Sequence, residues 1–166
     1  MKRLYLVRHA KSSWDDPGLH DSDRPLNKRG KRDAPFMGER LKKYHVVPDI
    51  IVSSPAKRAL KTAKIIAKKI NYPVKKIKTA NIIYNGNSFD LLSFIRNTDE
   101  AVNEAMLFGH NPEITGLANY FSNKIIPNMP TCGILCVEFN TGSWKEVAAE
   151  NGTVLFFDYP GKHRTV

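Results

Sequence analysis

Short apolar runs alternate with helical patterns along most of the 166 residues. The first run, Leu4 to Val7, is typical of a strand that is covered on both faces. Strands that alternate with helices indicate a layered α/β domain. We therefore predict a three-layer α/β/α sandwich with a mixed, mainly parallel central sheet, folded as one domain over residues 1–166.

The other elements are expected from apolar periodicity and from the residues that bound it. Further strands are expected over residues 48–52, 74–78, 105–108, 134–139 and 153–157, and the last two are expected to form a β-rich meander at one edge of the sheet. Helices are expected to begin at Asn27, Pro55, Ser88 and Pro112. Pro35 lies within the first helical pattern, so we expect that helix to kink or break there.

The charge balance favours anionic partners, because the net charge is +10 at pH 7. Part of this charge forms a basic face on the second expected helix, made of Lys57, Lys61, Lys64 and Lys68. That face is interpreted as solvated, or as a dock for an acidic phosphoprotein. A nucleic-acid-binding module is the rival class, but no aromatic residues are interleaved with the lysines, and no zinc-finger or RNP-like signature is present.

The sequence contains no apolar run near the roughly 20 residues that a membrane-spanning helix needs. Its first residues also lack the apolar stretch of a secretory signal. We therefore expect a soluble, cytoplasmic protein with no membrane partner, and we favour a monomer.

Basic or histidine side chains follow three of the expected strands. Arg8 and His9 end the first strand, Arg58 begins the helix after the second, and His110 follows the strand at 105–108. Ligands of open α/β sheets bind at the carboxyl edge of the strands. If these strands are neighbours, the side chains form a phosphate-sized anion site. Whether the side chains come together depends on the order of the strands in the sheet, and the sequence does not specify that order.

The polar loop after His9 supplies two further candidates for substrate binding. Ser12 could lend its hydroxyl to a phosphate, although no paired base makes it a nucleophile. Trp14 could be a platform for the substrate or an anchor of the loop in the core, and the sequence leaves both open.

Three segments resemble the signature segments of the histidine phosphatase superfamily. Leu6 to Ala10 is similar to its Arg-His-Gly signature, with Ala10 in the glycine position, Ser53 to Ala63 resembles its second segment, and Gly109 to Pro112 its third. With Asp23 to Leu26 and the Lys11 to Trp14 continuation, the chain is most similar to the short SixA-like branch of protein phosphohistidine phosphatases. The resemblance covers roughly the first two thirds of the chain and implies a phosphoglycerate mutase-like fold.

This resemblance implies a phosphatase in which His9 attacks phosphorus and forms a phosphohistidine intermediate. Arg8, Arg58 and His110 would hold the phosphoryl oxygens, and no metal or other cofactor would be needed. The implied substrate is a phosphohistidine protein. Small phosphate esters are the alternative, and a phosphate-binding module without turnover is a further one.

The leaving-group acid is where the sequence departs from much of the superfamily. Asp90 is the only acid in residues 81–90, and its place early in a helix suits charge placement at least as well as catalysis. The other candidates lie in the first loop: Asp15, Asp16, Asp21 and Asp23. The lack of an evident acid favours a phosphohistidine substrate, because the P–N bond is weak and the departing ring is easily protonated.

Overall fold

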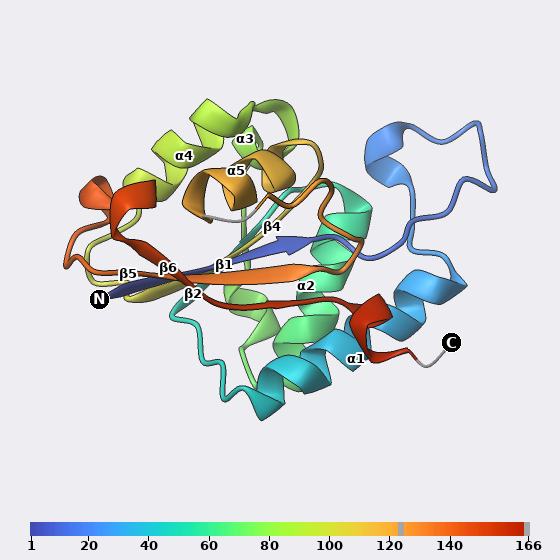
Figure 1. Ribbon diagram of the computed structural model, residues 1–166. Helices are drawn as coiled ribbons and strands as arrows, with labels where there is room; N and C mark the ends of the chain where they lie inside the picture. The colour runs from blue at the N-terminus through green and yellow to red at the C-terminus, as the bar shows by residue number, and fades with distance from the viewer. Residues whose placement is uncertain (123–124, 165–166) are drawn as a thin grey trace.

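The computed structural model describes residues 1–122 and 125–164 (Figure 1). Its middle layer is a six-stranded sheet with the strand order β3-β2-β4-β1-β5-β6. The strands are β1 (Lys2–Arg8), β2 (Ile50–Ser53), β3 (Lys78–Thr79), β4 (Glu104–Gly109), β5 (Ile134–Phe139) and β6 (Gly152–Asp158). The first four pair in parallel, β5 is antiparallel to β1, and β6 is antiparallel to β5. The predicted mixed sheet with a meander at one edge is confirmed.

Helices cover both faces of this sheet (Figure 1). On one face lie α1 (Lys28–Lys43) and α2 (Lys57–Lys69), and on the other lie α3 (Ile82–Asn85), α4 (Ser88–Arg96) and α5 (Glu113–Phe121). Residues of β1 alternate between two cores: Tyr5 belongs to the core beneath α1 and α2, whereas Leu6 belongs to the core beneath α4 and α5. The three-layer α/β/α sandwich is therefore confirmed.

Short 3-10 helices occupy several connections between these elements. They are η1 (Asp21–Asp23), η2 (Val74–Lys76), η3 (Trp144–Glu146), η4 (Ala149–Asn151) and η5 (Pro160–His163). In the described part of the chain, no helix is both long and apolar enough to cross a membrane.

Helix α1 runs without interruption through Pro35, so the predicted break is wrong. Its start is as expected, because the Asn27 side chain accepts a hydrogen bond from the Gly30 amide at 2.9 Å. A proline inside a helix costs about 3 kcal/mol. Met37 and Leu41 are fully buried on the inner face, and each such side chain contributes about 1.5 to 3 kcal/mol. Burial of this face therefore outweighs the lost backbone hydrogen bond.

Two other local predictions need correction. Residues 74–76 form η2 rather than a strand, because the Lys76 amide turns back to the Pro73 carbonyl at 2.9 Å. Asn87, not Ser88, caps α4. The Asn87 side chain accepts from the Asp90 amide, and the Asp90 carboxylate accepts from the Asn87 amide, both at 2.9 Å. This reciprocal pair satisfies two backbone donors at once, which one serine hydroxyl cannot do.

Candidate active site

Strands β2, β4 and β1 are neighbours in the sheet and run in the same direction. Arg8 ends β1 opposite Gly109, which ends β4, and the His9 amide donates to the Gly109 carbonyl at 3.1 Å. The Ser54 amide, just beyond β2, donates to the Phe108 carbonyl at 3.0 Å. Three strand ends therefore meet at one edge, and this strand order was the condition on which the predicted anion site depended.

A cavity of about 150 Å³ lies at this edge of the sheet. It is lined by the predicted residues Arg8, His9, Ser12, Trp14, Arg58 and His110. Four residues that the sequence did not single out as site residues complete the lining: Lys11, Arg24, Asn111 and Thr131. The structure thus gathers six of the seven predicted site residues around one polar cavity.

The imidazole of His9 has a defined tautomer. The ring is buried, and its Nδ1 lies 2.7 Å from the Ala10 carbonyl oxygen. A carbonyl oxygen only accepts hydrogen bonds, so Nδ1 carries the proton and Nε2 of the neutral ring keeps its lone pair. The acceptor that fixes the ring is therefore the backbone of the next residue, which a sequence pattern cannot identify.

Ala10 also connects this loop to helix α2. Its amide donates to the Thr62 hydroxyl oxygen at 3.0 Å, and that hydroxyl donates to the Arg58 carbonyl at 2.7 Å. Thr62 and Ala10 are fully buried. These two hydrogen bonds fix the position of His9 relative to the first turn of α2, where Arg58 lies.

The His9 ring is held neutral by its surroundings. Burial lowers the pKa of His9 to about 3, against the opposing effect of the hydrogen bond to Ala10. The positive charges of Arg58 and Arg8 lower this pKa further. Burial, aided by Arg58, also lowers the pKa of His110 to about 4. Both rings are therefore uncharged at neutral pH.

We expect nitrogen NMR of the imidazole rings to show His9 as the Nδ1–H tautomer at every pH above about 4. The same chain unfolded in urea, where histidine titrates near pH 6.5, is the control. Because the folded ring takes up its proton at lower pH than the unfolded one, the free energy of unfolding falls as pH drops from about 6.5 toward 3. A His9 midpoint near 6.5 in the folded protein would contradict this assignment.

His110 lies close to His9 and is held by a serine. The two ring centroids are 5.1 Å apart, and His110 Nε2 lies 2.7 Å from the Ser54 hydroxyl oxygen. That oxygen also accepts a hydrogen bond from the Ala56 amide at 3.1 Å. The other ring nitrogen, Nδ1, is buried and has no hydrogen-bond partner within residues 1–122 and 125–164.

The two predicted arginines are anchored differently. Arg8 donates from Nη1 to the Met129 carbonyl at 2.8 Å, and its buried Nε has no hydrogen-bond partner in the described ranges. Arg58 donates from Nη1 to the Asp21 carbonyl at 2.7 Å and from Nη2 to the Asp21 carboxylate at 2.9 Å. Both guanidinium groups therefore keep N–H groups that these contacts do not use.

Asp21 comes from the loop after His9 and reaches this cluster through η1. Its carboxylate accepts hydrogen bonds from the Tyr84 hydroxyl at 2.7 Å, from Arg58, and from Arg24 at 3.0 Å. The Tyr84 hydrogen bond and the two arginines hold the pKa of Asp21 well below its usual range. An aspartate that is ionised at neutral pH has no proton to donate to a leaving group.

Asp90, the predicted acid of residues 81–90, does not line the cavity, and neither do the loop candidates Asp15, Asp16, Asp21 and Asp23. The Asp90 carboxylate belongs to the N-terminal cap of α4, where it accepts from the Asn87 amide. Of the two interpretations that the sequence left open, this contact is the one expected from charge placement at a helix start.

The side chains of Trp14 and Ser12 both contact Arg24. The Arg24 guanidinium carbon lies 3.3 Å from the centroid of the Trp14 ring, and the same side chain donates to the Ser12 hydroxyl. Trp14 is 72% exposed, so it lies at the cavity rim and does not anchor the loop in the core. Arg24 also forms an ion pair with Asp21. It could have been found from the sequence, because it lies in the Asp23 to Leu26 element that carries part of the resemblance.

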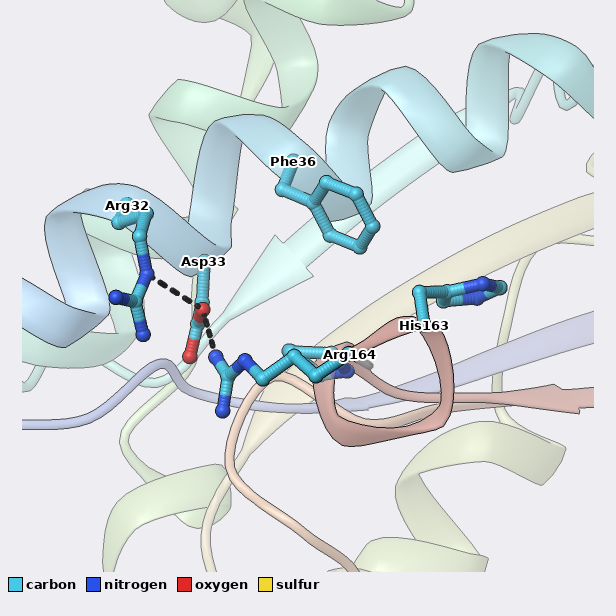
Figure 2. A pocket seen from close by; sticks show the side chains of 6 residues that line it. Arg32, Asp33, Phe36, His163 and Arg164 are labelled. Atoms are coloured by element: carbon cyan, nitrogen blue, oxygen red, sulfur yellow. Dashed lines mark hydrogen bonds and ion pairs between the residues drawn. The ribbon is translucent and has the colours of Figure 1, made fainter. Parts of the chain in front are cut away.

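A larger hollow of about 390 Å³ lies elsewhere, between α1 and η5, and contains none of the predicted site residues. Figure 2 shows Arg32 and Arg164 both reaching Asp33 across it. The two arginine charges are thus already directed at a buried carboxylate. Across the described residues, no three His, Cys, Asp or Glu side chains gather as a metal site would require.

Comparison with known proteins gives the sequence family and the structures that this chain is similar to. A family model for the histidine phosphatase superfamily, branch 1, matches residues 4–83. A crystal structure from Agrobacterium tumefaciens, assigned as the phosphohistidine phosphatase SixA, superposes with a TM-score of 0.81 at 28% identity and covers 96% of this chain and 98% of that one. In sequence over residues 4–83 and in structure over nearly its whole length, the chain is similar to the histidine phosphatase superfamily. It has the phosphoglycerate mutase-like fold of that superfamily.

Two further members of the histidine phosphatase superfamily extend the comparison. The protein histidine phosphatase SixA in complex with tungstate has the same fold, with a TM-score of 0.81 at 21% identity over 98% of this chain and 99% of that chain. Phosphoserine phosphatase 1 of Hydrogenobacter thermophilus is 41% identical over 78 residues, which are 46% of this chain and 36% of that protein. The protein is accordingly a phosphatase of the histidine type.

Proposed function

We propose that this protein is a metal-independent phosphohistidine phosphatase that works through a phosphoryl intermediate on His9. The observation that carries the proposal is the Nδ1 hydrogen bond of His9 to Ala10, which leaves an unprotonated Nε2 in a ring that lines a cavity with three arginines. A neutral, desolvated imidazole nitrogen is a competent nucleophile toward phosphorus.

In the first step, Nε2 of His9 forms a bond to phosphorus while the bond from phosphorus to the substrate nitrogen breaks. The departing imidazole takes the electron pair of that bond. It leaves as a neutral ring when its other nitrogen already carries a proton, so this substrate needs no acid from the protein. An alkyl ester has no such internal proton, and its alkoxide must be protonated by a general acid.

In the second step, water attacks the phosphorus of phosphorylated His9. A ring that keeps its Nδ1 proton on Ala10 and bears a phosphoryl group on Nε2 is positively charged. It therefore leaves readily as neutral imidazole, and dihydrogen phosphate is released. The Ala10 hydrogen bond thus serves both steps, because it keeps the same proton on the same nitrogen throughout.

Arg8, Arg58 and His110 would stabilise the negative charge on the transferring phosphoryl oxygens. Arg8 Nε is buried, has no partner in the described residues, and is a donor of the kind that such oxygens accept from. His110 Nδ1, also without a partner there, is a second such donor in the tautomer in which the Ser54 hydroxyl donates to Nε2. A SixA protein of the same fold forms a complex with tungstate, a tetrahedral oxyanion, which is consistent with a fold that accepts phosphate-like anions.

The test is phosphate release in excess EDTA from a phosphohistidine peptide and from matched alkyl and aryl phosphomonoesters. We expect turnover to survive chelation, and we expect kcat/KM to be higher for phosphohistidine than for alkyl esters by about 10²-fold or more. Aryl esters are expected to fall between them, because phenolate leaves more easily than alkoxide. Alkyl esters that react as fast as phosphohistidine would contradict the substrate assignment while leaving the His9 mechanism in place.

A small-molecule phosphomonoesterase is the second candidate function, and the similarity to a phosphoserine phosphatase favours it. The same substrate series separates the two candidate functions. A small-molecule phosphomonoesterase would have a higher kcat/KM for phosphate esters than for phosphohistidine, which reverses the order expected above. The cytoplasmic location and the monomeric state stay predictions.

A further inference from the structure

The positive charge of this protein is concentrated in one segment. Residues 50–89 contain eight lysines and Arg58, with no aspartate or glutamate. This segment therefore carries nine of the ten net positive charges, and the rest of the chain is close to neutral. An excess this local indicates a surface with a preferred partner rather than general solubility.

Helix α2 presents this charge on its outer face. Ala59, Ala63 and Ile66 are fully buried on its inner face. The outer face consists of four exposed lysines, Lys57, Lys61, Lys64 and Lys68, which we call the α2 lysine face. Within residues 1–122 and 125–164 none of these four forms an ion pair, whereas Lys69, off this face, pairs with Glu39 at 3.1 Å.

The α2 lysine face begins at the candidate active site. Lys57 directly precedes Arg58, which lines the cavity from the first turn of α2. From Lys57 to Lys68 the helix rises about 17 Å. A partner bound along this face would therefore have one end at the phosphate site, and an extended strand of about five residues would span it.

We propose that the α2 lysine face docks an acidic surface of the protein whose phosphohistidine enters the cavity. The inference rests on the proposed function for the identity of the delivered group. Charge complementarity selects an acidic partner. A protein is favoured over nucleic acid because no large apolar or aromatic side chain of α2 is exposed, and single-stranded nucleic acids bind aromatic platforms as well as charge.

The test uses two synthetic phosphohistidine peptides, one flanked by six glutamates and one by six glutamines, with phosphoimidazole as the small-substrate reference. Two triple variants carry the same loss of charge. One is Lys61→Gln, Lys64→Gln, Lys68→Gln on the α2 lysine face, and the control is Lys42→Gln, Lys43→Gln, Lys145→Gln at exposed positions elsewhere. Turnover is measured at low and at high salt, and binding is measured by fluorescence anisotropy.

At low salt we expect kcat/KM to be about tenfold higher for the glutamate peptide, because each exposed ion pair contributes about a factor of two. This preference should disappear in the α2 variant, persist in the control variant, and fade at about 0.5 M salt. Turnover of phosphoimidazole is expected to be the same in all three proteins, which shows that the variants fold.

Equal kcat/KM for the two peptides in the unaltered protein would overturn the proposal, as would an equal loss of preference in both triple variants. A 20-nucleotide single strand that displaces the glutamate peptide at lower concentration than the peptide itself, through the same three lysines, would reassign the face to nucleic acid. If neither peptide is hydrolysed but the glutamate peptide still binds through these lysines, the docking surface stands and the proposed function fails.

Discussion

Alanine in place of His9 is expected to lower phosphatase turnover by at least about 10⁴-fold, because it removes the atom that forms the bond to phosphorus. The remaining cavity still holds Arg8, Arg58 and His110, so the variant is expected to bind phosphate and vanadate without turning over substrate. Rapid mixing with phosphohistidine peptide, followed by intact-protein mass spectrometry, measures the phosphoryl adduct directly. The unaltered protein should carry one acid-labile phosphoryl group, and the variant none.

His20→Ala is the control for this experiment, because His20 is exposed and does not line the cavity. It should retain full turnover and form the adduct. A His9→Ala protein that keeps a tenth of the activity, or an adduct located on His110 by peptide mapping, would contradict the mechanism. An inactive His9→Ala variant that also fails to bind vanadate would point to a disturbed cavity instead, and the Ala10 hydrogen bond would be the first contact to inspect.

The layered fold was predictable because the buried strands of the sheet leave local patterns in the sequence. Buried strands such as β4 appear as continuous apolar runs, and α5 begins directly after Pro112, where a helix was expected. The expected strand over residues 74–78 is wrong except at Lys78, which begins β3. Val74 and Ile77 are three residues apart, and a 3-10 turn places both against the core where an extended strand would point them to opposite faces. The predicted break at Pro35 is wrong because burial of the inner face of α1 contributes more free energy than the proline costs the helix locally.

The site was predictable as far as it consists of residues next to strand ends. Arg8, His9 and His110 lie there, and Arg58 lies in the first turn of the helix that follows β2. Residues from three distant parts of the sequence could therefore be expected at one edge. Asp21 and Tyr84 belong to loop and helix positions whose partners depend on tertiary folding. The sequence offered Asp21 as one of several acids, but it could not show that this carboxylate accepts hydrogen bonds from three different side chains.

The Arg58 guanidinium contacts Asp21 as well as lining the cavity. Replacing Arg58 is therefore expected to have the second large effect on activity. Arg58→Ala is expected to lower kcat/KM by about 10³-fold, because the phosphoryl group loses a charged donor and Asp21 loses one of its three side-chain partners. Arg58→Lys is expected to recover no more than about tenfold, since an ammonium cannot contact both Asp21 and two phosphoryl oxygens as a planar fork can. Guanidinium ion added to the Arg58→Ala protein should restore part of the activity, and steady-state kinetics measure this.

The Asp21→Asn variant tests whether Asp21 acts by positioning Arg58 or through its own negative charge. The amide oxygen can still accept from Arg58, and the Asp21 backbone carbonyl contact at 2.7 Å is unaffected, so we expect a decrease in kcat/KM of only about tenfold. If Asp21 acts through Arg58, the Arg58→Ala/Asp21→Asn double variant will be no slower than Arg58→Ala alone, because the carboxylate has nothing left to position. Effects that simply multiply in the double variant would instead mean that Asp21 contributes independently, through Tyr84 or Arg24. In that case the rescue by guanidinium ion would also be insensitive to Asp21→Asn, which distinguishes the two outcomes by a second measurement.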